Sequence, residues 1–128
     1  MRLPARLIAA LVLIAALVAP ALAREEIRSF AADITLRSDG AVEVVETIDV
    51  NAEGMDIRRG IYRDIPIVLL GPKGNKIRVG LDVSGVTRDG RPEMFRVERM
   101  GDFQRIWIGD PDQFIAVREH RYQISYTM

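Results

Sequence analysis

The sequence has no cysteine and only one histidine among its 128 residues. Without cysteine the chain forms no disulfide and has no thiolate nucleophile or thiolate metal ligand. A zinc site needs three or four ligands, typically nitrogen or sulfur atoms, and His120 without any cysteine cannot supply them. A serine–histidine–aspartate triad would depend on the same histidine, and no Gly-x-Ser-x-Gly motif is present. We therefore predict no catalytic residue, no metal site and no cofactor, and we expect His120 at the surface or at a sheet edge.

The sequence also lacks an excess of charge of either sign. It has 18 basic and 18 acidic residues, and two of the basic ones, Arg2 and Arg6, precede the first apolar run. The chain after residue 23 therefore has a net charge of −2. This balance gives no electrostatic reason for binding to nucleic acid or to an anionic membrane surface. We predict that nucleic acid is not a partner.

A long apolar run occurs only near the N-terminus. Residues 7–18 are all apolar, follow the two arginines, and are followed by Pro20 and an Ala-Leu-Ala sequence that ends at residue 23. A positive start, a short apolar segment and a small-residue cleavage site are the three parts of a secretory signal. The run is shorter than the roughly 20 residues of a transmembrane helix. We predict a signal peptide at residues 1–23 and an extracytoplasmic domain at residues 24–128; an uncleaved anchor is the alternative.

From residue 29 onward, apolar and polar residues alternate with a period of two, which is typical of half-buried strands. Asp39-Gly40 and Asp89-Gly90 are tight-turn sequences that predict two hairpins. The expected strands include residues 30–36, 42–50, 57–65, 77–83, 95–97, 106–108 and 122–126. Seven short strands separated by turns predict an all-β antiparallel sandwich, immunoglobulin-like or related. The last strand still alternates at Met128, so we expect a sandwich that is incomplete at its C-terminus.

One acidic residue, Glu46, lies on the apolar face of the strand at residues 42–50. Arg59 and Arg63 lie on the apolar face of the next expected strand. A hairpin between the two strands would bring Glu46 near a guanidinium in each register that keeps their apolar faces together. Because an isolated buried charge is costly, we predict a partly buried ion cluster of Glu46, Arg59 and Arg63. Such a cluster would fix strand register, and a polar ligand pocket is the alternative.

Two further groups of residues are weak candidates for ligand binding. Asp102, Asp110 and Asp112 could converge on calcium, but they do not have EF-hand spacing and Gly-Asp-Pro-Asp is also an ordinary turn sequence. We interpret this segment as a turn. Trp107 could stack on a sugar, although a single tryptophan in a small sandwich is more often part of the core. We keep Trp107 as a weak candidate for ligand stacking.

Two motifs suggest a family. V-E-V-V-E-T-I-D-V at residues 42–50 and R-G-I-Y-R-D-I-P at residues 59–66 resemble the start of domain-of-unknown-function family 2207, a family of predicted bacterial membrane proteins. Later blocks are also similar, so the resemblance covers residues 27–126. It implies an exported β domain followed by transmembrane helices beyond this chain. No activity is established for the family, so it implies no catalytic residue.

These observations favour a non-enzymatic interaction or structural module of the cell envelope, on the periplasmic or extracytoplasmic face of the cytoplasmic membrane. We expect an envelope protein as its partner and membrane attachment through a segment outside this chain. One alternative is a carbohydrate- or ligand-binding domain that uses Trp107 and nearby acids. Another is a non-functional fragment of a longer membrane protein, whose unpaired sheet edge would favour aggregation. A cooperative, monomeric melt of residues 24–128 would exclude the fragment.

Overall fold

The computed structural model describes residues 26–128, which contain ten β-strands and no helix. The predicted signal peptide lies outside the described residues. The strands are β1 (Glu26–Leu36), β2 (Val42–Asn51), β3 (Ile61–Pro66), β4 (Val68–Leu70), β5 (Lys76–Arg78), β6 (Asp82–Arg88), β7 (Arg91–Pro92), β8 (Phe95–Met100), β9 (Phe103–Ile108) and β10 (Glu119–Thr127). All their pairings are antiparallel. The predicted all-β antiparallel class is confirmed.

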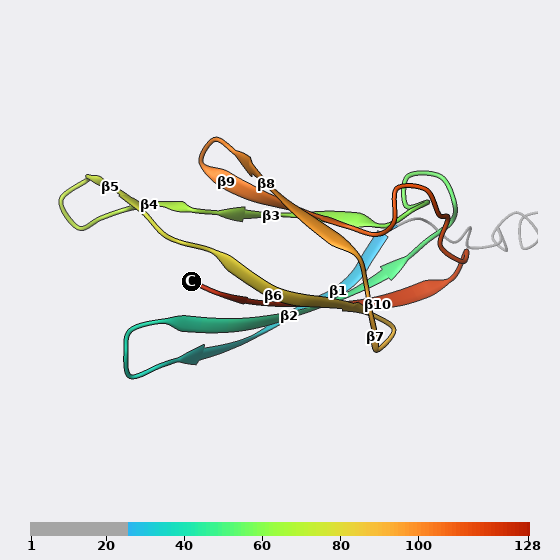
Figure 1. Ribbon diagram of the computed structural model, residues 1–128, viewed down its shortest axis with the longest axis horizontal. Coiled ribbons are helices and arrows are strands. Elements are labelled where there is room, and N and C mark those ends of the chain that lie inside the picture. The colour runs from blue at the N-terminus through green and yellow to red at the C-terminus, as the bar shows by residue number, and fades with distance from the viewer. Residues whose placement is uncertain (1–25) are drawn as a thin grey trace, which may run out of the picture.

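The strands form two facing layers. One layer is a five-stranded sheet in the order β1-β2-β10-β6-β7, and the other is a three-stranded sheet in the order β3-β9-β8. Figure 1 shows the larger sheet as the lower layer and the smaller sheet as the upper layer. The β4–β5 hairpin forms a third, separate sheet and extends from one end of the upper layer. The turn between β1 and β2 extends from the same end of the lower layer.

The core lies between the layers because apolar residues alternate along the central strands. In β10, Tyr122, Ile124 and Tyr126 point inward and are buried, whereas their neighbours point outward. Ile106 and Ile108 of β9 are buried from the opposite sheet. Full burial of one such side chain contributes roughly 1.5–3 kcal/mol relative to an exposed one. Alternation in the sequence therefore explains both the strands and the position of the core.

Both predicted hairpins are present. Asp89 and Gly90 have φ angles of 53° and 79° and connect β6 to β7. Aspartate and glycine tolerate positive φ better than most residues, and two such residues in succession match the twist of a tight hairpin. Gly40, with φ of 89°, lies in the turn between β1 and β2. The turn sequences thus predict these local pairings correctly.

The expected hairpin between residues 42–50 and 57–65 is wrong. β2 pairs with β1 on one edge and with β10 on the other, so it has no free edge for β3. β3 begins only at Ile61 and pairs with β9 in the opposite sheet. The segment between β2 and β3 therefore crosses from one layer to the other. Similarly, the expected strand at residues 77–83 is divided into β5 and β6 around Gly80.

Candidate functional site

The Glu46 carboxylate is buried between the two sheets, with only 3 % of its side chain exposed. Its Oε2 accepts a hydrogen bond from Arg63 Nε at 2.8 Å, and its Oε1 accepts one from Arg63 Nη2 at 3.0 Å. The Tyr126 hydroxyl donates a third hydrogen bond to Oε1 at 2.8 Å. β2, β3 and β10 each supply one residue, so this cluster joins the upper layer to two strands of the lower one.

The three hydrogen bonds compensate the buried charge of Glu46. A two-pronged arginine–carboxylate contact is among the strongest polar contacts in proteins, because both groups are charged and their planes match. Hydrogen bonding to Glu46 raises the pKa of the Arg63 guanidinium. Burial, together with the hydrogen bond to Glu46, raises the pKa of Tyr126. Arg63 therefore stays charged and Tyr126 stays protonated at neutral pH, and both remain donors to Glu46.

The structure brings two of the three predicted cluster residues together. Arg59 lies apart, with its guanidinium carbon 4.7 Å from the centre of the Phe114 ring. It precedes β3, so the alternation that places Arg63 over Glu46 does not extend to it. Sequence reasoning missed Tyr126, although Tyr126 shares the buried face of the last strand with Tyr122. That shared face is the signal that could have identified it.

The outer face of the three-stranded sheet carries interleaved aromatic and charged side chains. We call Tyr62, Asp64, Arg96, Arg105 and Trp107 the aromatic–arginine face. The Arg105 guanidinium carbon lies 4.1 Å from the Tyr62 ring centre and 5.1 Å from that of Trp107. The same guanidinium donates to both Asp64 oxygens, at 2.8 and 2.9 Å. Hydrogen bonding raises the pKa of Arg105 and lowers that of Asp64.

Trp107 lies on this outer face, half-buried, and not in the core that sequence reasoning favoured. Its neighbours Ile106 and Ile108 are buried, so alternation directs the indole outward. The indole Nε1 donates a hydrogen bond to Glu98 Oε2 at 2.9 Å. The Tyr62 and Trp107 rings are 5.6 Å apart and tilted by 53°. The tryptophan is thus held in place on the surface by contacts on several sides.

A hollow of about 500 Å³ adjoins Trp107 and Tyr62. Arg58, Arg59 and Arg96 also line it. With Phe95, which also lines it, the hollow combines three aromatic residues with arginines, an arrangement that suits a flat polar ligand or a peptide side chain.

Two glycines allow the backbone beside this hollow to approach closely. Gly60, just before β3, has φ of 151°, and Gly109, just after β9, has φ of 123°. A Cβ atom on Gly60 would lie 1.8 Å from the Ile108 carbonyl oxygen, and one on Gly109 would lie 2.2 Å from the Arg59 carbonyl oxygen. Any larger residue would push these segments apart. The two glycines therefore set the shape of this end of the hollow.

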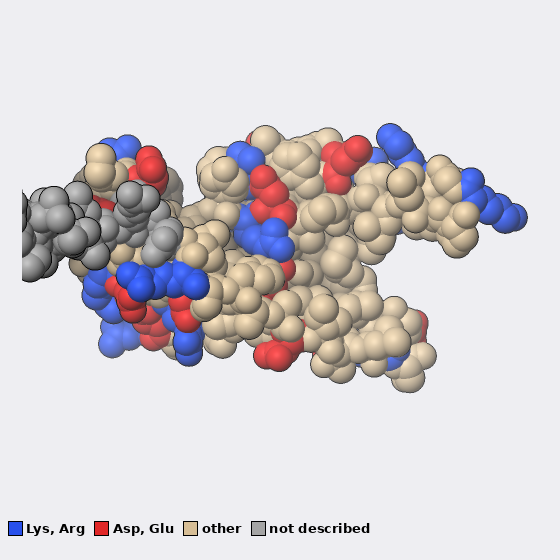
Figure 2. Space-filling view, turned by 180° about the vertical axis from the view of Figure 1, so that it is seen from behind, with Lys and Arg blue, Asp and Glu red and all other residues tan. Residues whose placement is uncertain are grey.

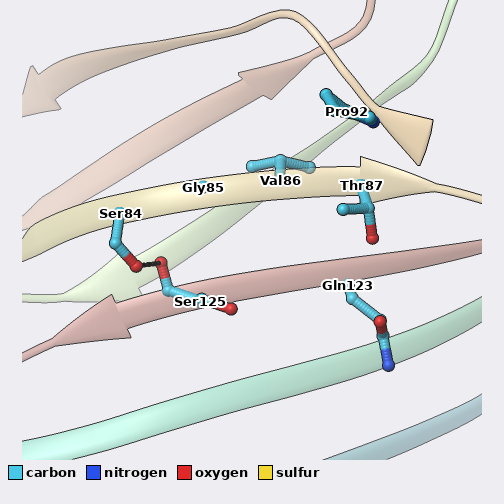
Figure 3. Close-up of a pocket in the computed structure, with 7 residues that line it drawn as sticks. All are labelled: Ser84, Gly85, Val86, Thr87, Pro92, Gln123 and Ser125. Carbon is cyan, nitrogen blue, oxygen red and sulfur yellow. Dashed lines mark hydrogen bonds between the residues drawn. The ribbon is translucent and has the colours of Figure 1, made fainter. Parts of the chain in front are cut away.

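A second, smaller hollow of about 340 Å³ lies on the outer face of the five-stranded sheet. Figure 3 shows the residues that line it, and none of the seven is charged or aromatic. The hydroxyl of Ser84 on β6 donates a hydrogen bond to the Ser125 carbonyl on β10 at 3.1 Å. Gly85 and Ser125 lie opposite each other with little side-chain volume between them. We interpret this hollow as a gap left by small residues.

His120 is buried, and the expectation of a surface or edge position is wrong. Alternation places it on the same face of β10 as Tyr122, which the sequence pattern already contained. Its Nδ1 lies 2.7 Å from Asp89 Oδ2 and its Nε2 lies 2.7 Å from the Ala116 carbonyl oxygen. Both contacts are hydrogen bonds only when both ring nitrogens carry protons. His120 thus connects the β6–β7 turn to the loop that precedes β10.

Asp89 is held in place by more than His120. The backbone N–H of Arg121 donates to Asp89 Oδ1 at 2.9 Å. Burial raises the pKa of Asp89, but the hydrogen bonds from Arg121 and His120 and the charge of Arg118 outweigh it, and the pKa is lowered overall. Sequence analysis identified Asp89 only as a turn residue. Its contacts come from segments distant in the chain, which turn chemistry does not reveal.

No group of three or more histidine or acidic side chains within residues 26–128 is placed to hold a metal ion. The backbone N–H of Asp112 donates to Asp110 Oδ1 at 2.9 Å, which is the local hydrogen bond of a turn. The described part of the chain also contains no helix with the length and hydropathy needed to cross a membrane.

Residues 26–128 match the family model described as "Predicted membrane protein (DUF2207) N-terminal domain". Over 104 residues, the chain is 33 % identical to the uncharacterized protein YciQ of Escherichia coli strain K12. This match covers 81 % of the chain but only 16 % of YciQ. The chain therefore spans far less than the whole length of that relative. No solved structure matches the chain.

Proposed function

Because the chain belongs to the family of predicted membrane proteins whose N-terminal domain it matches, we propose that this β-sandwich is a non-enzymatic, extracytoplasmic module that binds another protein of the cell envelope. The order of a positive start, an apolar segment and a small-residue cleavage sequence in residues 1–23 supports export. Membership of the family supports association with a membrane. The binding role is supported by one observation above all, which is the aromatic–arginine face.

The composition of that face favours protein recognition. Tryptophan, tyrosine and arginine are the residues most enriched among those that dominate the energy of protein interfaces. Tyr62 is 56 % exposed although its ring contacts Arg105 and Trp107. Contacts within the face already restrict its side chains. Binding of a partner would therefore cost little of their conformational entropy. We expect a partner surface with apolar groups to cover the rings and acceptors to meet the guanidinium groups.

Site-specific photo-crosslinking in the native envelope tests this proposal. A photoreactive phenylalanine analogue replaces Tyr62 on the aromatic–arginine face, and the matched control replaces Gln123, an exposed residue on the outer face of the other sheet. We expect a defined crosslinked band from position 62 alone, and its loss when Trp107→Ala is added. Equal crosslinking from both positions, or a band that persists without Trp107, would argue against this face.

A second candidate function is carbohydrate or small-ligand binding in the hollow beside Trp107. The observation that favours it is the pairing of two surface aromatic rings with guanidinium donors around one concave site. Sugars offer an apolar ring face for stacking and hydroxyl groups for hydrogen bonds. A glycan-array signal that Trp107→Ala removes would support this candidate. A silent array, together with the crosslink from position 62, would leave the protein partner as the better account.

A further inference from the structure

The inner face of the larger sheet is covered over β2 but open over β1. Phe30, Ile34 and Leu36 of β1 lie directly opposite Ile48, Val44 and Val42 of β2. Residues opposite each other in an antiparallel pair point to the same face of the sheet. Ile48 and Val44 are buried, yet Phe30, Ile34 and Leu36 are 51 %, 67 % and 74 % exposed. The three β1 residues, which we call the β1 strip, therefore point toward the core side without being covered.

The upper layer ends above the boundary between β2 and β1. Arg63 of β3 contacts Glu46 of β2, and its guanidinium carbon lies 5.3 Å from the centre of the Phe30 ring. β3 is therefore above β2 and reaches only the near edge of β1. β3 pairs with β9 on one side, and its other edge has no strand beside it among the described residues. That free edge faces the side on which the β1 strip is exposed.

We infer that a further strand pairs with the free edge of β3 and covers the β1 strip. Neighbouring strands lie about 4.8 Å apart and facing sheets about 10 Å apart, so a strand beside β3 would lie above β1. It would satisfy the edge hydrogen bonds of β3 and place every second side chain on Phe30, Ile34 and Leu36. Figure 2 shows an opening at one end of the molecule, between the β4–β5 arm and the β1–β2 arm, with few charged side chains around it.

The strand that covers the β1 strip belongs to the same membrane protein and lies outside the 128 residues of this sequence. The chain matches only 16 % of its relative YciQ, so the longer protein has ample chain to supply a strand. Met128 exchanges two backbone hydrogen bonds with Val42, each of 2.9 Å, and Val42 in turn lies opposite Leu36. A chain that continues from Met128 would therefore start two strands from the strip, at the open end of the sandwich.

The size of the strip favours a tethered strand over a second copy of the chain. Three side chains of this kind expose roughly 300 Å² of apolar surface, judged from the burial energy of each. A stable dimer buries about 800 Å² on each partner. A tethered strand has a high effective concentration and needs no such area. This inference depends on the family match and not on the aromatic–arginine face, which lies on the opposite side of the upper layer.

Cysteine labelling tests the inference, because the chain has no cysteine of its own. Ile34→Cys places a thiol in the strip, and Thr35→Cys, on the opposite face of the same strand, is the matched control. Both positions are exposed in the chain, so neither substitution removes a core contact. In residues 24–128 we expect the two thiols to react with a maleimide at similar rates, within about threefold.

The second arm uses full-length YciQ in membranes, freed of any native cysteine. We expect the position aligned with Ile34 to react at least about tenfold more slowly than the position aligned with Thr35. Equal rates in full-length YciQ would overturn the inference. Slow labelling of Ile34→Cys in residues 24–128 that accelerates on dilution would also overturn it, because a second copy would then cover the strip. Neither outcome alters crosslinking from position 62. The labelling experiment therefore tests coverage of the β1 strip independently of partner binding by the aromatic–arginine face.

Discussion

Two arginine–carboxylate contacts of nearly the same geometry lie on opposite faces of β3. On the inner face, Arg63 donates to both oxygens of Glu46, at 2.8 and 3.0 Å. On the outer face, Arg105 donates to both oxygens of Asp64, at 2.8 and 2.9 Å. Their surroundings differ, because 3 % of the Glu46 side chain is exposed compared with 34 % of that of Asp64.

From this difference we expect burial, and not geometry, to decide what each contact contributes to stability. An exposed ion pair gains little because water already solvates both charges. A buried pair is expensive to form, but removing one member leaves the other charge without a partner and destabilises the fold strongly. We therefore assign Glu46–Arg63 to holding the two layers together and Asp64–Arg105 to shaping a surface. The predictions below test this division, from the largest expected effect to the smallest.

Glu46→Ala should produce the largest loss. It removes the acceptor of three hydrogen bonds and leaves the Arg63 guanidinium and the Tyr126 hydroxyl without their partner. We expect the free energy of unfolding of residues 24–128 to fall by about 3–5 kcal/mol. Urea unfolding monitored by far-ultraviolet circular dichroism measures this.

Glu43→Ala is the matched control for that variant. Glu43 is on the same strand but points outward and contacts Arg37 in solvent. Its loss should change the free energy of unfolding by no more than about 0.5 kcal/mol. Similar effects at positions 43 and 46 would show that the inner contact is not buried as described.

Two tyrosines on the inner face of β10 should respond differently to removal of a hydroxyl group. Tyr126→Phe deletes a donor to a buried carboxylate and should cost about 1.5–3 kcal/mol. The buried Tyr122 hydroxyl has no hydrogen-bond partner within residues 26–128, and burial raises its pKa to about 12. Tyr122→Phe should therefore be neutral or stabilising by up to about 1 kcal/mol. Thermal unfolding of both variants measures the contrast, and an equal cost would contradict it.

Asp89→Asn tests an ion contact of intermediate exposure. The folded-state pKa of Asp89 is lowered, so its carboxylate stabilises the fold above the ordinary aspartate pKa near 3.8. That contribution is lost as the pH falls from this value through the lowered folded-state pKa. We expect a loss of about 1 kcal/mol at pH 7 in the variant, shrinking toward zero in strong acid. Denaturation at a series of pH values measures it, and a constant difference would contradict the assignment.

Arg105→Gln should have the smallest effect on stability. The contact with Asp64 is on the surface, so we expect a melting temperature close to that of the wild type. The same substitution should nevertheless reduce crosslinking from position 62, because it removes the guanidinium that contacts both the Tyr62 and the Trp107 rings. A large loss of stability in Arg105→Gln would erase the distinction between the two faces of β3.

The sequence pattern predicted what depends on neighbouring residues. Alternation gave the all-β antiparallel class and the inward direction of Glu46, whereas the expectation that Trp107 belongs to the core was wrong. Asp39-Gly40 and Asp89-Gly90 gave two hairpins, because positive φ is a local property of these residue types. The closeness of Glu46 and Arg63 was also expected, since a charge on an apolar face needs a partner.

The pattern did not reveal which strands pair across long distances. Glu46 was expected beside arginines of a neighbouring strand, but Arg63 reaches it from the opposite sheet. β10 takes the edge of β2 that β3 was expected to occupy, and nothing local in either sequence encodes that choice. The burial of His120 was missed although alternation with Tyr122 indicated it. Only its partners Asp89 and Ala116 depend on the folded topology.

A pair of double-mutant cycles tests the central claim most directly. One cycle combines Glu46→Gln with Arg63→Met, and the other combines Asp64→Asn with Arg105→Met. We predict a coupling energy of at least about 2 kcal/mol for the inner pair and a coupling within experimental error of zero for the outer pair. Equal coupling energies in the two cycles would contradict the claim that burial separates the roles of these contacts.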